Sequence, residues 1–124
     1  MIHEAERWLR TLDHVREENV YLKQRFADLM HLTANKHLLK QAEHLQNCIL
    51  DSDTVNAILR NEIRKHEQQL REHRSAVNVL PEKTIITHRI LRNDMMKLEK
   101  NFSSLHFDLN LFMDDATDDY HLAA

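Results

Sequence analysis

The chain has 124 residues, with no glycine, one proline and a formal net charge of −3 when its ten histidines are neutral. The absence of glycine excludes motifs that need a positive φ or a close backbone approach, such as phosphate-binding loops, dinucleotide-binding turns and tight hairpins. Because helix-forming residues dominate the rest of the composition, we expect one all-α domain.

Cys48 is the only cysteine, so no disulfide framework is expected and a reducing compartment is favoured. The first residues lack the basic and apolar regions of a signal peptide. Uninterrupted apolar runs are far shorter than the ~20 residues that span a membrane. These features predict a cytoplasmic protein without a membrane segment.

The first predicted helix covers about residues 4–33. Its apolar positions recur at spacings of three and four, which is the pattern of a helix that packs against other helices. These positions are Ala5, Trp8, Leu12, Val15, Asn19, Leu22, Phe26, Leu29 and Thr33. Asn19 is a polar residue in the middle of this series, and it could set the register either within the chain or in a parallel dimer through this helix.

The heptad phase breaks between Thr33 and Leu38, which predicts a turn with Asn35 as its left-handed residue. A second helix then follows over about 36–79, with the same spacing from Leu38 to Leu80. Residues 51–54 read Asp-Ser-Asp-Thr, side chains that cap helix N-termini. A break at 51–54 would make a four-helix bundle, and this alternative stays open beside the three-helix one.

Pro81 ends the second helix and suits the start of a third, which we expect over about 82–113. Residues 114–119 contain four aspartates, where the helix dipole disfavours negative charge. The predicted organisation is therefore an antiparallel bundle or coiled coil of three long helices at 1–113, followed by a loosely ordered acidic tail at 114–124.

Folding consecutive helices back at their turns predicts which residues meet. The first turn places Asn19 beside Ser52, with Asn56 one layer away, as a polar layer that sets the register. The second turn, folded between Leu80 and Pro81, places His88 beside His73 and Met95 beside His66.

We call the row of residues at these three- and four-residue spacings the seam of a helix. In this arrangement both ends of the bundle are only two helices thick, and the seam at each end is apolar. Such a surface predicts a partner, most simply a second copy that makes a homodimer, although another protein could cover it. The candidate interface residues are Leu38, Ala42, Leu45, Leu70, Val77 and Leu80.

The histidines of the second and third helices are the candidates for chemistry. His73 and His88 could form half of a metal site, and Glu62 lies one helical turn before His66. Against a metal, no Glu-x-x-His pair of the di-iron bundles occurs. Neutral histidines at a partly exposed seam, or a pH-sensitive interface, are the other interpretations.

Residues 60–92 carry eight Lys or Arg against four Asp or Glu, but no aromatic residue lies between Phe26 and Phe102 to stack on bases. Nucleic-acid binding is therefore not expected, and no arrangement of residues suggests catalysis or a cofactor.

The sequence predicts a non-catalytic interaction or scaffolding module that self-associates. The alternative function is a histidine-based metal-binding or pH-sensing bundle.

Overall fold

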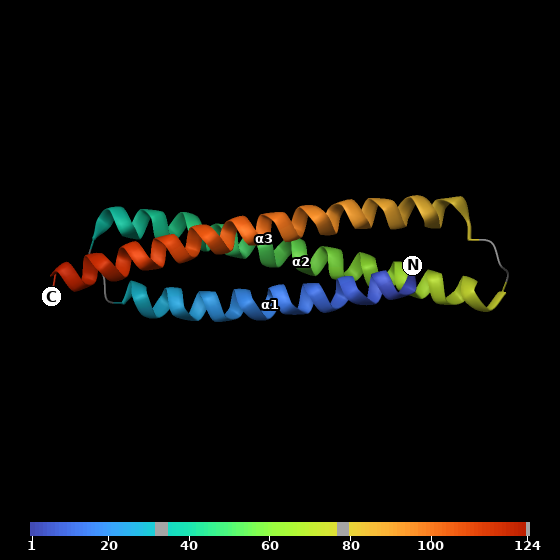
Figure 1. Cartoon of the computed structure of the whole chain (residues 1–124), viewed down its shortest axis with the longest axis horizontal. Coiled ribbons are helices and arrows are strands. Elements are labelled where there is room, and N and C mark those ends of the chain that lie inside the picture. Colours follow the sequence, from blue (N-terminus) through green and yellow to red (C-terminus); the bar gives the residue numbers. More distant parts are fainter. Residues whose placement is uncertain (32–34, 77–79, 124) are drawn as a thin grey trace.

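The computed structural model describes residues 1–31, 35–76 and 80–123, and side chains within 1–31, 35–73 and 80–117. Three helices follow in order: α1 (Ile2–Met30), α2 (Lys36–Ala76) and α3 (Glu82–Ala123). They run alternately up and down as an elongated bundle (Figure 1). The prediction of an all-α, three-helix bundle is confirmed. α1 begins two residues and ends three residues earlier than predicted, and the predicted end of α2 at residue 79 lies outside the described residues.

α2 is continuous through residues 51–54, so the four-helix alternative is wrong. The side chains that could have capped a new helix have other partners. Ser52 and Asp53 both accept hydrogen bonds from the Asn19 amide, at 3.2 and 3.0 Å. The Thr54 hydroxyl donates to the Leu50 carbonyl one turn earlier, at 3.1 Å. None of these contacts requires the helix to start again.

The turn before α2 works differently from the prediction. Asn35 is not left-handed, because no described residue has a positive φ. Its side-chain oxygen instead accepts hydrogen bonds from the backbone N–H groups of His37 and Leu38, at 2.9 and 3.3 Å. Asn35 is therefore the N-cap of α2.

α3 does not end at residue 113 but continues to Ala123, so the tail predicted at 114–124 is largely helical. The buried stripe of α3 extends through Leu109, Phe112, Met113 and Ala116, and the last two are 3 % and 1 % exposed. Burial of these residues against the other helices outweighs the unfavourable position of the aspartates at a helix C-terminus.

The core consists of two apolar clusters separated by a polar layer. One cluster contains Ala5, Trp8, Leu12, Val15, Leu59, Ile63, Leu70, Leu91, Met95 and Leu98. The other contains Leu22, Phe26, Leu38, Ala42, Ile49, Leu109, Phe112, Met113 and Ala116. Between them lie Asn19 and Asn56, which are 0 % and 2 % exposed.

The predicted register is right at the first turn and wrong at the second. Asn19 bonds Ser52 as expected, so α1 and α2 have the predicted alignment. His88, however, lies against His66 instead of His73, a shift of one heptad between α2 and α3. A shift of seven residues keeps every seam position opposite another seam position, so apolar spacing cannot distinguish the two registers.

The heptad shift moves α3 towards the Leu38 end of the bundle, where it covers the seam that was expected to be open. Leu38, Ala42 and Leu70 are 7 %, 4 % and 3 % exposed, and Leu45 and Leu80 are partly buried in the clusters. These predicted interface residues are therefore buried or partly buried within the chain's own core. Val77 lies outside the described residues. At the end near the α2–α3 turn, α2 and α3 extend past α1 (Figure 1).

Candidate functional site

The first candidate site is a row of polar side chains that links all three helices and is buried at its histidine end. His66 of α2 and His88 of α3 are 2 % and 1 % exposed, and the His66 Nε2 and His88 Nδ1 atoms are 2.8 Å apart. On its other side His88 Nε2 lies 2.5 Å from Glu4 Oε1 of α1. Arg92 then donates two hydrogen bonds to the Glu4 carboxylate, at 2.8 and 3.0 Å. The row therefore runs from His66 through His88 and Glu4 to Arg92.

Helix geometry explains why these four side chains meet. His88 and Arg92 are one turn apart on α3, so both face the N-terminal turn of α1. Trp8 lies one turn after Glu4, and its ring packs on the His88 imidazole with centroids 4.8 Å apart. The indole covers the face of the imidazole, which keeps water away from the histidine pair.

The charge state of the row follows from its contacts. The hydrogen bonds from Arg92, together with the contact with His88, lower the pKa of Glu4 to about 2, although burial acts in the opposite direction. Glu4 is therefore an anion at neutral pH. Burial, together with the adjacent His88 and the amino group of Met1, lowers the pKa of His66 below 6.5. His66 is consequently neutral at pH 7.

The hydrogen-bond pattern allows one set of tautomers when both rings are in the neutral form. When His88 Nε2–H donates to Glu4, its Nδ1 must accept from His66 Nε2–H. His66 Nδ1 then keeps a lone pair, and it has no hydrogen-bond partner among the described residues. Protonation of His66 would place a second buried donor at this unpaired atom, so the cluster disfavours an additional proton on His66.

The four residues predicted as metal ligands are only partly brought together. Glu62, His66 and His73 line an open groove between α2 and α3 with a volume of about 530 Å³. His88 is on the other side of His66, bound to Glu4. Among the described side chains, no three histidine, cysteine or acidic groups are arranged to hold a metal ion. The metal hypothesis therefore gains no support from the geometry.

The sequence pattern does not indicate Glu4 or Arg92 as site residues, and it identifies Trp8 only as a packing position of the first helix. Glu4 lies 84 residues before His88 and 88 before Arg92. Only the correct α3 register brings them together, and the apolar spacing leaves that register open by a heptad. A charged residue beside a seam position, opposite a seam histidine, is the one signal that could have indicated the contact.

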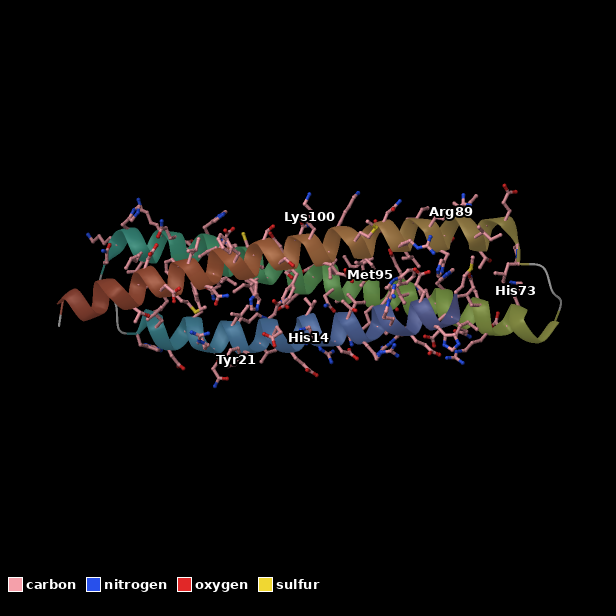
Figure 2. The ribbon with its side chains drawn as sticks, in the orientation of Figure 1. His14, Tyr21, His73, Arg89, Met95 and Lys100 are labelled. Atoms are coloured by element: carbon pink, nitrogen blue, oxygen red, sulfur yellow. The ribbon has the colours of Figure 1, made fainter. Side chains whose placement is uncertain are left out.

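The second candidate site is the outer face formed by α2 and α3. Two open grooves run along it and share Cys48, Leu105 and Asp108, and the first also contains Val55 and Leu98. Val55 lines the first groove and Leu111 the second. The large apolar side chains of α2 and α3 that are 47–64 % exposed include Val55, Ile58, Ile86, Ile90, Met96, Phe107 and Leu111. Arg89 and Lys100 project from the outer edge of α3, while Met95 points into the bundle (Figure 2).

The chain has no match among protein-family models, curated proteins or solved structures. None of the helices that the structure describes combines the length and the apolar character needed to cross a membrane.

Proposed function

We propose that the chain is a non-catalytic interaction or scaffolding module that self-associates as a homodimer. The observation that carries this proposal is the exposure of Ile86, Ile90, Phe107 and Leu111, four large apolar side chains of α3 that are 48–64 % exposed. They lie on the outer side of a helix whose inner side is already packed against α1 and α2. Exposed apolar side chains that are grouped on one surface mark interaction sites, whereas single exposed ones are normal on any protein.

Two features of the bundle support a scaffolding role. The polar layer and the histidine row join all three helices through buried hydrogen bonds, which favours one well-defined arrangement over sliding alternatives. A defined arrangement keeps a surface in one shape for a partner. The single thiol of Cys48 is consistent with action in the cytoplasm.

The self-association proposal is tested by the mass of the protein in solution. Light scattering at tens of micromolar should give twice the chain mass of 14.8 kDa. Ile90→Gln should shift the protein towards the monomer, because it removes an exposed apolar contact on α3. Val20→Gln is the matched control, since Val20 of α1 is 57 % exposed and lies on a different helix. A monomer mass for the unmodified chain would overturn the proposal.

A second candidate function is pH sensing, and a specific observation favours it: the buried contact between His66, His88 and Glu4. A bundle joined through this row would be weakened at acid pH, because His66 takes up a proton more readily when unfolded. The row includes a side chain from each helix: Glu4 of α1, His66 of α2, and His88 and Arg92 of α3. Urea denaturation of the unmodified chain and of His66→Gln across pH 8 to 5 tests this candidate.

A further inference from the structure

Four of the five large apolar residues of α3 that are exposed in the described part of the helix form two equivalent pairs on one stripe, and Met96 is the fifth. Ile86 and Ile90 are four residues apart, as are Phe107 and Leu111. The two pairs are 21 residues apart, or three heptads. Ile86 lies two residues before the buried His88, and Phe107 lies two residues before the buried Leu109. Both pairs therefore occupy the same position relative to the core, about 32 Å apart along the helix.

These two pairs match each other when two copies of α3 run antiparallel. Residue numbers that add to 197 then face each other across a two-fold axis between residues 98 and 99. Ile86 faces Leu111 of the second copy, and Ile90 faces Phe107. A shift of one heptad in either direction loses both apolar matches, so the pattern selects one register.

The charges on α3 favour the same arrangement. Residues 82–100 contain five Lys or Arg and three Asp or Glu, whereas residues 101–124 contain five Asp and no Lys or Arg. An antiparallel pair places the acidic half of one copy on the basic half of the other, and a parallel pair would place the acidic halves together. The register that sums to 197 also brings Arg89 opposite Asp108 and Lys83 opposite Asp114. All four side chains are exposed, and none of them forms an ion pair with another described residue.

The neighbouring helix adds apolar surface at the centre of this contact. Val55 of α2 lines the same groove as Leu98 of α3, so it lies level with the two-fold axis. Ile58 follows one turn later and is 54 % exposed. In this register Lys97 of each copy faces Lys100 of the other beside the axis. Their flexible stems can carry the like-charged ammonium groups outwards to water, and so apart, while covering apolar surface.

We propose that the occupant of this face is a second copy of the chain, docked antiparallel so that Ile86 and Ile90 of each copy contact Leu111 and Phe107 of the other. This inference rests on the proposed self-association and adds its interface, direction and register. The contact is isologous, so it closes at two copies and does not extend into a filament.

Disulfide trapping tests the register directly. Two chains are made in a Cys48→Ser background, one carrying Ile90→Cys and the other Phe107→Cys, and they differ in mass through an added tag. Each chain alone, and a 1:1 mixture, is equilibrated in a glutathione redox buffer and analysed by mass spectrometry. The mixture should form the heterodisulfide, which joins position 90 of one chain to position 107 of the other, in at least tenfold excess over either homodisulfide.

The geometry gives the reason for this excess. In the proposed dimer two copies of position 90 are 17 residues apart along the helices, roughly 25 Å, whereas a disulfide needs Cα atoms within about 7 Å. A chain with Val20→Cys, mixed with the Ile90→Cys chain, is the control that should stay uncrosslinked.

The outcomes separate this inference from the proposed function. A dimer mass for the reduced chains without the heterodisulfide, or with the homodisulfide of the Ile90→Cys chain, would overturn the antiparallel register and leave self-association standing. A monomer mass for the unmodified protein would overturn both. Predominant heterodisulfide together with a dimer mass is the result that we expect.

Discussion

Asn56 and Asn61 are five residues apart on α2 and lie in opposite environments. The Asn56 amide is 2 % exposed and donates a hydrogen bond to the Leu12 carbonyl of α1 at 2.9 Å. Asn61 is exposed at the edge of the α1–α2 groove. The same side chain therefore links two helices at position 56 and faces solvent at position 61.

Asn56→Ala should therefore destabilise the protein, because it leaves the buried Leu12 carbonyl without this donor. The expected loss in the free energy of unfolding is about 1–3 kcal/mol, measured by urea denaturation. Asn61→Ala changes the helix propensity equally but removes no buried hydrogen bond, and we expect a change within about 0.5 kcal/mol. Equal effects of the two substitutions would show that the buried bond contributes nothing.

The histidine row makes stability depend on pH. Because the folded pKa of His66 lies below its unfolded value of 6.5, the unfolded chain binds more protons as the pH falls through 6.5. The free energy of unfolding should be constant above this value and decrease below it. Glu4 acts in the same direction in a lower window, since its pKa is about 2 when folded and 4.5 when unfolded.

This prediction is checked by urea midpoints between pH 8 and 5, a range that excludes most of the Glu4 window. His66→Gln keeps an amide donor for His88 but cannot titrate, so its midpoints should fall less steeply below pH 6.5. His14→Gln, a change at an exposed position of α1, should retain the wild-type slope. A His66→Gln slope as steep as the wild type would assign the pH dependence to other groups.

At the residue scale, the sequence indicates buried polar groups only where the seam spacing names them. Asn19, Ser52 and Asn56 occupy seam positions, and Asn19 and Ser52 do form the predicted contact. His66 and His88 also occupy seam positions, although the apolar spacing pairs His88 with His73 and the structure pairs it with His66. Glu4 and Arg92 lie beside the seam, where charged residues are usually solvated, so nothing local distinguishes them.

At the scale of single elements, helix type and number follow from the seam, and the helix ends depend on tertiary packing. α2 continues through a sequence that resembles an N-terminus because α1 supplies partners for Ser52 and Asp53. α3 continues through an aspartate-rich segment because Met113 and Ala116 are buried against the other helices. Local propensity gives the wrong answer in both places, since the deciding contacts are distant in sequence.

The extension of α3 predicts that residue 116 is part of the core. Ala116→Asp should reduce the free energy of unfolding by on the order of 3 kcal/mol, because it places a carboxylate at a position that is 1 % exposed. Thr117→Asp puts the same charge on the exposed side of the same turn and should change stability much less. Thermal unfolding followed by circular dichroism measures both. If residues 114–124 were a solvated tail, the two substitutions would have equal and small effects.

At the scale of the whole molecule, the register between α2 and α3 decides which surfaces remain. The predicted register left the Leu38 end uncovered, and the observed heptad shift buries Leu38 and Ala42. The outer stripe of α3 is one of the apolar surfaces that stay exposed, and its residues lie outside the seam, so the seam spacing does not identify them. The prediction of self-association is kept as a proposal, with a different surface as its basis.

Charge reversal measured by sedimentation equilibrium tests this surface most directly. Arg89→Asp or Asp108→Arg alone replaces two attractive contacts of the symmetric dimer with two repulsive ones, and each should weaken dimerisation by about tenfold or more. The double variant restores opposite charges across the axis, as does a 1:1 mixture of the two single variants, so both should dimerise like the unmodified chain. Single variants that dimerise normally, or a double variant and a mixture that stay monomeric, would contradict the antiparallel α3 contact.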